Sequence, residues 1–191
     1  MPVPECVPEI AGRVRASSPR VGATRVVCVD GPAGSGKTTL AGALAEALGG
    51  APVVHLDDLY EGWSQELGAT LAARVEAWLL IPWAAGLAGM HPRYDWGIGR
   101  YCEWVPVPAA PIVVIEGCAS GSWGTRRSAS LVVWVEAPAE LRLQRGLDRD
   151  GPALEAQWRD WQAHEEAHFA SDGTRAAADV RVDGTTGRIV G

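Results

Sequence analysis

The feature that most constrains the fold is a glycine-rich stretch between an apolar run and a helical pattern. The apolar run at 26–29 is typical of a buried strand. Gly-Pro-Ala-Gly-Ser-Gly-Lys-Thr follows at 31–38, with the full G-x-x-x-x-G-K-[ST] spacing of a phosphate-binding loop. Leu40, Leu44 and Leu48 then recur at helical spacing. This order of elements predicts an α/β fold with a phosphate site where the helix begins.

The residue types of the loop suit the binding of anionic oxygens. Glycines let the backbone approach a phosphate closely, and backbone amides at a helix N-terminus form an anion nest. Lys37 is expected to reach the β- and γ-phosphates of ATP, and the Thr38 hydroxyl to ligate Mg²⁺. Lys37 is also the only lysine among 17 basic residues, which favours this assignment over a chance glycine-rich turn. The residues predicted to bind the nucleotide here are Gly31, Ala33, Gly34, Ser35, Gly36, Lys37, Thr38 and Thr39.

The length and net charge of the chain favour a single globular domain and disfavour some classes of partner. A chain of 191 residues, 47% hydrophobic and 21% charged, is expected to form one globular domain over 1–191. Its net charge of −6 disfavours a nucleic-acid or membrane partner. The sequence lacks a secretory signal pattern and any membrane-length apolar stretch. Four scattered cysteines fit a reducing cytosol, so we expect a cytoplasmic protein, with a homo-oligomer left open.

Apolar runs alternate with helical patterns along the chain. Further strands are predicted at 52–56, 111–116, 130–136, 178–182 and 188–190. The stretch at 63–90 is expected to be mostly helical with interruptions at Pro82, Gly86 and Gly89, and 91–108 to be irregular. Alternation of this kind predicts a three-layer fold with a parallel sheet covered by helices on both faces. Within it we expect an N-terminal extension at 1–24, a substrate-binding insert at 63–108 and a lid at 138–152.

Acidic residues stand at the ends of several predicted strands. Because ligands of open parallel sheets bind beyond the carboxyl ends of the strands, Asp30, Asp57 with Asp58, and Glu116 are expected to face the same crevice as Lys37. Asp57 is predicted to accept the proton of an attacking hydroxyl and to lie near the metal, with helix capping as the alternative. Asp58 is expected to be structural or a second metal contact. Glu116 is a candidate Mg²⁺ ligand, directly or through water, or a loop-capping residue.

Three arginines of the predicted lid share one helical face. Arg142, Arg145 and Arg149 are spaced i, i+3 and i+7. Such a face matches a lid that folds over triphosphate oxygens, with Arg145 stabilising charge in the transition state. A solvated arginine-rich surface is the alternative.

Aromatic residues gather in the predicted insert. Five of the 9 tryptophans lie between 63 and 104. Tyr94, Asp95 and Trp96 are predicted to contact a flat substrate, because an aspartate between aromatic residues in an irregular segment has no evident structural reason. Core filling is the alternative.

This ordered set of motifs resembles the uridine kinase-like nucleoside kinases, relatives of phosphoribulokinase and bacterial pantothenate kinase among the P-loop kinases. The matching segments are Leu-Asp-Asp-Leu-Tyr at 56–60, Pro-Arg-Tyr-Asp-Trp at 92–96, Val-Val-Ile-Glu-Gly at 113–117, Arg-Leu-Gln-Arg at 142–145 with Arg-Asp at 149–150, and Ala-Asp-Val at 178–180. The resemblance implies a P-loop NTPase fold, ATP and Mg²⁺ as cofactors, and Asp57 as the catalytic base. It also implies acceptor contacts from Asp57, Tyr60, Tyr94, Asp95, Trp96 and Arg100. The His-Ser-Arg stretch of pyrimidine-binding members is replaced by Gly-Ile-Gly-Arg at 97–100.

These patterns together predict ATP- and Mg²⁺-dependent transfer of the γ-phosphate to a hydroxyl of a small molecule, with a nucleoside as first candidate. Other acceptors stay open: a nucleoside monophosphate, a cofactor precursor or a hydroxylated antibiotic. A monophosphate would need basic residues in the insert, which offers Arg74, Arg93 and Arg100. A non-catalytic nucleotide-binding module is the alternative from another class. A GTPase is disfavoured, because the N-K-x-D guanine motif needs a second lysine.

Overall fold

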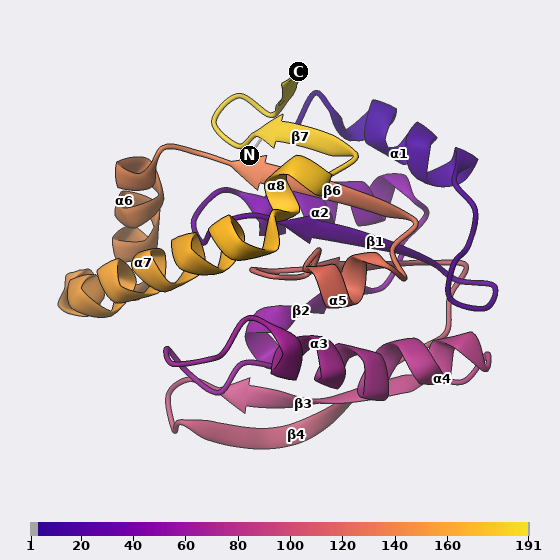
Figure 1. The fold of residues 1–191 in the computed structure, drawn as a ribbon, viewed down its shortest axis with the longest axis horizontal. Coiled ribbons are helices and arrows are strands. Elements are labelled where there is room, and N and C mark those ends of the chain that lie inside the picture. The colour runs from indigo at the N-terminus through magenta and orange to yellow at the C-terminus, as the bar shows by residue number, and fades with distance from the viewer. Residues whose placement is uncertain (1–3, 191) are drawn as a thin grey trace.

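The computed structural model describes residues 4–190 and is built around a six-stranded sheet (Figure 1). The strand order is β2-β5-β1-β6-β7-β8, with β8 antiparallel to β7 and the other pairs parallel. The strands are β1 (Arg25–Asp30), β2 (Val53–His55), β5 (Ile112–Glu116), β6 (Leu131–Glu136), β7 (Val180–Asp183) and β8 (Arg188–Val190). The predicted parallel sheet is confirmed, and its central strand β1 leads directly into the phosphate-binding loop.

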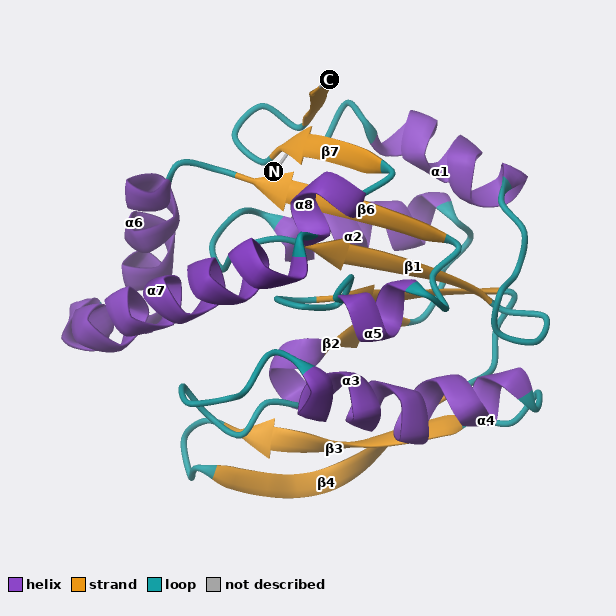
Figure 2. Ribbon diagram, in the orientation of Figure 1, coloured by secondary structure: helices purple, strands orange, loops and turns teal. Residues whose placement is uncertain are grey.

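Helices cover both faces of this sheet (Figure 2). On one face lie α1 (Val7–Ala16) and α2 (Lys37–Ala47). The other face is covered by α3 (Ala69–Val75), α4 (Ile81–Ala84), α5 (Trp123–Arg126), α7 (Glu155–Asp172) and α8 (Thr174–Ala177). In β1, Val26 and Cys28 enter one core while Val27 and Val29 enter the other, and all four are 0% exposed. Burial on both sides explains why the strands are apolar without alternation.

The helical stretch after the second strand is continuous. Helix α3 passes through a π-helical turn (Glu76–Leu80) into α4. The predicted interruption at Pro82 is wrong, because the helix continues past this proline to Ala84, whereas the predicted interruptions are confirmed at Gly86, which lies in a turn, and at Gly89, where β3 begins. A proline has no backbone N–H to donate to the preceding turn, and the change to π-helical pairing lies directly before it.

Residues after α4 form a β-hairpin of β3 (Gly89–Asp95) and β4 (Arg100–Val107), a separate two-stranded sheet that lies beside the α3–α4 segment (Figure 1). The prediction of an irregular segment is wrong. Pro92 and Pro106 disfavour a strand in the sequence, but both strands of a two-stranded sheet are edges, where proline is tolerated. The tip of the hairpin, Trp96 to Gly99, reaches toward the site described below.

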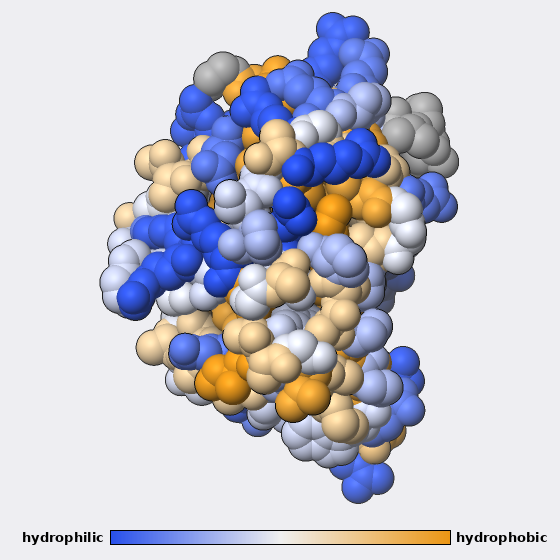
Figure 3. All heavy atoms as spheres, turned by 90° about the vertical axis from the view of Figure 1, so that its right-hand side faces the viewer, coloured by the Kyte–Doolittle hydropathy of each residue, from blue (hydrophilic) through white to orange (hydrophobic). Residues whose placement is uncertain are grey.

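The segment predicted as a lid, 138–152, corresponds to a single helix with its flanking residues. Helix α6 (Ala139–Asp150) begins directly after Pro138 and packs on α7, and both extend from the sheet on the left of Figure 1. Gly146 faces the Trp158 ring so closely that a β-carbon there would clash with it. The opposite end of the molecule shows hydrophobic residues only in small separate groups (Figure 3). Between residues 4 and 190, no helix combines the length and apolar character needed to cross a membrane.

Candidate active site

A cavity of about 830 Å³ opens beyond the carboxyl ends of β1, β2 and β5. Its lining comes from the phosphate-binding loop, the segments after β2 and β5, the hairpin tip, the lid helix α6, and α7 with the turn before it. The lining residues are Ala33, Gly34, Gly36, Lys37, Thr38, Thr39, Asp57, Asp58, Tyr60, Trp63, Trp96, Gly97, Glu116, Cys118, Arg145, Gly146, Arg149, Asp150, Leu154, Trp158 and Trp161. The strand ends therefore bring most of the predicted site residues to one place, as expected for an open parallel sheet.

The loop has the backbone geometry that its glycines permit. Gly34 and Gly36 have φ angles of 76° and 104°, in the region that other residues avoid. Lys37 is 7% exposed, and its Nζ donates to the carbonyl of Pro32 at 2.9 Å and to Cys118 Sγ at 3.7 Å. Burial alone would lower the pKa of Lys37, but the thiol and the surrounding carboxylates raise it, so the side chain is a cation at neutral pH.

Thr38 and Glu116 meet across the start of α2 and the end of β5. The Thr38 hydroxyl donates to Glu116 Oε1 at 3.2 Å, and His55 Nδ1 lies 2.6 Å from the same oxygen. This hydrogen bond raises the pKa of His55. Hydroxyl and carboxylate oxygens are the hard donors that Mg²⁺ takes. No cluster of three or more His, Cys, Asp or Glu side chains in the described chain could hold a metal by itself, so nucleotide and water oxygens would complete a Mg²⁺ shell.

Asp57 lies in the 3₁₀ turn Leu56–Asp58 that follows β2, with its side chain open to the cavity. Its backbone carbonyl accepts a hydrogen bond from Trp96 Nε1 at 3.2 Å. Its carboxylate has no hydrogen-bond partner among residues 4–190 and is free to accept one. The cavity walls limit its hydration and the Glu116 carboxylate repels its charge, so the pKa of Asp57 is raised.

The three lid arginines take different positions. Arg145 lines the cavity and donates to the carbonyls of Gly34 at 3.1 Å and Gly184 at 3.2 Å. Arg149 also lines it, paired with Asp150. Arg142, predicted to meet the triphosphate, does not line the cavity: its side chain is 12% exposed and pairs with a buried glutamate.

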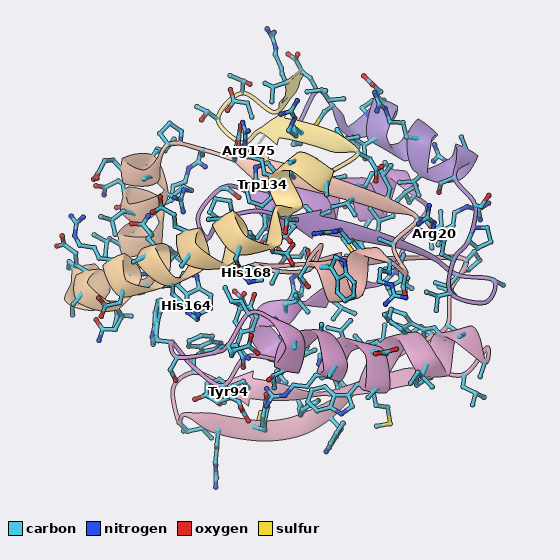
Figure 4. The ribbon with its side chains drawn as sticks, in the orientation of Figure 1. Arg20, Tyr94, Trp134, His164, His168 and Arg175 are labelled. Atoms are coloured by element: carbon cyan, nitrogen blue, oxygen red, sulfur yellow. The ribbon has the colours of Figure 1, made fainter. Side chains whose placement is uncertain are left out.

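Some of the residues predicted to contact the acceptor line the cavity, and others do not. Tyr60 and Trp96 line the cavity, whereas Tyr94, Asp95 and Arg100 do not. Asp95 Oδ1 accepts hydrogen bonds from the amides of the next turn at 2.8 and 3.2 Å, so the expectation that it lacks a structural reason is wrong. Tyr94, on the hairpin (Figure 4), packs edge-on against Trp96 with ring centres 5.5 Å apart. These residues shape the hairpin tip that presents Trp96.

Asp30 does not face the crevice, contrary to the prediction. Its carboxylate is 0% exposed and accepts hydrogen bonds from the amides of Gly31, Ala119 and Gly121 at 2.6 to 2.9 Å. Burial raises the pKa of Asp30 to about 7, although these hydrogen bonds and Lys37 oppose the shift. Asp30 therefore ties the loops after β1 and β5 together, with no contact to the cavity.

Two residues that sequence analysis missed stand next to the loop. Glu165 contacts the phosphate-binding loop from α7, and Cys118 lies between Lys37 and Glu165. Glu165 shares a helical face with Trp158 and Trp161, and all three are buried. An acid on the apolar face of a helix is the signal that would have found it.

No protein-family model matches the chain. The chain is 32% identical to the cytidylate kinase of Thermococcus sibiricus over 130 residues, which cover 68% of this chain and 60% of that protein. It is 25% identical to the cytidylate kinase of Methanococcoides burtonii over 135 residues, which cover 71% of this chain and 69% of that protein. The chain thus spans about 60% of the length of the first of these relatives.

In structure, the chain is similar to a possible uridine kinase from Bacillus stearothermophilus. The TM-score is 0.65 at 21% sequence identity, and the match covers 92% of this chain and 96% of that one. Both the sequence relatives and this structure are named as kinases. The chain therefore has the α/β fold of the P-loop kinases, and its resemblance to the uridine kinase-like group is confirmed at the level of the fold.

Proposed function

We propose that the protein transfers the γ-phosphoryl group of ATP to a hydroxyl of a small, phosphate-free molecule, with a nucleoside as the first candidate. One observation carries this proposal: the Lys37 ammonium, the Thr38–Glu116 oxygen pair and the unpaired Asp57 carboxylate line one cavity. Phosphoryl transfer requires a phosphate cradle, a metal site and an acceptor for the hydroxyl proton within reach of one another.

Each group has a distinct task in this proposal. The loop amides and Lys37 bind the β- and γ-phosphates, and Arg145 and Arg149 stabilise charge on the transferred group. Thr38 and Glu116 would hold Mg²⁺, which neutralises phosphate charge when bound. Asp57 accepts the proton of the acceptor hydroxyl, and its raised pKa makes it a stronger base than an ordinary aspartate.

The acceptor half of the cavity is aromatic. We define it by Asp57, Asp58, Tyr60, Trp63, Trp96 and Gly97. Trp63 packs edge-on against Trp96, with ring centres 5.6 Å apart, and also against Trp158 and Trp161 of α7. Trp96 keeps 43% of its surface exposed and lines the cavity, so part of its indole is open to a ligand. Stacking on such faces suits a planar acceptor, such as the base of a nucleoside.

The acceptor half also lacks a cation for a phosphate group. Lys37, Arg145 and Arg149 are the only lysine or arginine side chains in the described lining, and all belong to the loop or the lid. In the insert, Arg74 pairs with Glu61 at 2.7 Å. Arg93 pairs with Glu103, and neither arginine reaches the cavity.

A second candidate is a nucleoside monophosphate acceptor, because the relatives in sequence are named cytidylate kinases. A monophosphate would place its negative charge beside the carboxylates of Asp57 and Asp58, with no basic side chain in that half to bind it. The charge distribution therefore favours the phosphate-free acceptor.

An assay of acceptor-stimulated ADP release tests the proposal. The purified protein with MgATP is offered nucleosides, nucleoside monophosphates, cofactor precursors and hydroxylated antibiotics. We expect stimulation by a phosphate-free planar acceptor and none by cytidylate. Stimulation by cytidylate alone would establish the second candidate, and tight ATP binding without stimulation by any acceptor would favour a non-catalytic module.

A further inference from the structure

A buried carboxylate of α7 joins three elements that are distant in the sequence. Glu165 is 1% exposed. Its Oε1 accepts a hydrogen bond from Arg142 of the lid helix at 2.6 Å. Its Oε2 accepts the backbone N–H of Ala33 at 2.7 Å and the thiol of Cys118 at 3.4 Å. Both oxygens are therefore engaged, and none of these partners belongs to α7 itself.

Arg142 also contacts Ala33, the residue of the phosphate-binding loop that Glu165 binds. Its Nη1 also donates to the carbonyl oxygen of Ala33 at 3.2 Å, and its Nε donates to the carbonyl of Ala137 at 3.1 Å. The N–H and the C=O of Ala33 are thus both held, one by Glu165 and the other by Arg142. A β-carbon on Gly34, the next residue, would come within 2.5 Å of the Arg142 carbonyl, so the lid backbone also packs directly on the loop.

The buried ion pair of Arg142 and Glu165 restricts the conformation of the groups around it. Burying an ion pair removes both charges from water, so the pair adds little net stability while it restricts the conformations available to the groups it touches. Here the restricted group is the loop that must aim its amides at phosphate oxygens. Preorganised donors bind an anion without the cost of ordering them at that moment.

We propose that Glu165 is a positioning residue: together with Arg142 it holds the phosphate-binding loop in its phosphate-ready conformation before nucleotide arrives. The proposal rests on the nucleotide-binding part of the proposed function. Arg142 serves the triphosphate through the loop in this account, and Arg145 and Arg149 serve it from the cavity wall. Cys118, in contact with both Lys37 and Glu165, links this clamp to the loop lysine.

Calorimetric binding of MgATP and MgADP tests the proposal. Glu165→Gln keeps the size of the side chain but removes the charge that faces Arg142 and Ala33. We expect affinity for both nucleotides to fall by about tenfold or more, the loss of a charge-assisted hydrogen bond in a buried site. Glu166→Gln, one residue along on the exposed face of α7, is the matched control and is expected to bind like the wild type.

Three further measurements separate positioning from general stability. In Glu165→Gln the KM for ATP should rise while the KM for the acceptor stays within about twofold of the wild type, because only the loop is disturbed. The double variant with Arg142→Gln should lose little more than Glu165→Gln alone, since the two residues act as one clamp. Arg142→Lys, which keeps the charge but not the fork, should weaken nucleotide binding in the same direction and remains informative if Glu165→Gln does not fold.

Unchanged nucleotide affinity in Glu165→Gln, or equal losses for nucleotide and acceptor, would overturn the proposal. If the wild type itself failed to bind MgATP, the proposed function would fall first, so the two failures are distinguishable.

Discussion

Different kinds of contact hold the acceptor half of the cavity and its donor half, which we define by the phosphate-binding loop with Arg145 and Arg149. On the donor side, polar groups clamp the phosphate-binding loop: Arg145 holds the Gly34 carbonyl, and Glu165 with Arg142 holds Ala33. On the acceptor side, aromatic rings pack edge-on against one another, and Trp96 donates its indole N–H to the Asp57 carbonyl. For the proposed reaction, the donor half offers fixed positive charge and directed amides, and the acceptor half offers aromatic surface.

This difference assigns the two halves to different parts of the proposed reaction. Phosphate recognition demands positive charge and directed amides, which leaves little freedom in the loop. The aromatic side chains of the acceptor half come from other segments, Trp96 from the hairpin and Trp63 from the stretch before α3. Variants in each half should therefore affect different kinetic constants.

The largest effect is expected where the two halves meet. Asp57→Asn should lower kcat by about 10³-fold, because the amide cannot take the hydroxyl proton, while MgATP binding survives. Rapid-quench turnover and calorimetry measure the two quantities. Asp160→Asn, exposed on α7, is the control. Full turnover by Asp57→Asn would remove Asp57 from the chemistry.

On the donor side, Lys37→Ala should weaken MgATP binding and slow transfer, together by about 10²-fold in kcat/KM, since the compact charge beside the phosphates is lost. Steady-state kinetics with ATP as the varied substrate measure this. The kcat/KM of Lys37→Arg should lie between those of the wild type and Lys37→Ala, because the guanidinium keeps the charge but not the shape of the ammonium. Wild-type kinetics in Lys37→Ala would contradict the assignment of the loop.

On the acceptor side, Trp96→Ala should raise the KM for the acceptor by about tenfold and leave the KM for ATP unchanged, because a stacking face is lost. Trp104→Ala is the matched control: this tryptophan of β4 is 57% exposed and does not line the cavity. Equal effects of the two variants would mean that the hairpin matters only as a scaffold.

The smallest effect expected is a displaced pH profile. Asp57 must be unprotonated to accept a proton, so kcat should fall as the pH drops through its pKa, which is raised above the ordinary value of 3.8. Turnover measured from about pH 4 to pH 8 should show this acid limb above the range of an ordinary aspartate. An acid limb at or below that range would show that the cavity does not raise the pKa of the base.

Much of the donor half could be predicted, because its signals are local. The strand, the glycine loop and the helix are contiguous, and a strand buried on both faces is an uninterrupted apolar run. Asp57 and Glu116 followed from the rule that parallel strands end at one edge. Asp30 also lies at the end of its strand, but its carboxylate points away from the cavity, because it accepts hydrogen bonds from three backbone amides.

The acceptor half was harder to predict. The hairpin has prolines in both strands and a register shift between Arg93 and Tyr94, so its apolar residues show no clean alternation. The role of Asp95 in the turn depends on which amides the hairpin brings to it. Neither feature has a sequence pattern that separates it from an irregular segment.

The sequence by itself determined the phosphate-binding loop, the parallel sheet and the set of acids at its edge, since each depends on neighbouring residues or on a period of the chain. Only the tertiary structure decided which arginines face the cavity and that Glu165, 132 residues along the chain from Ala33, holds the loop. The physical reason is that a buried charge must find its partners in space, and which groups are near it depends on how the helices pack.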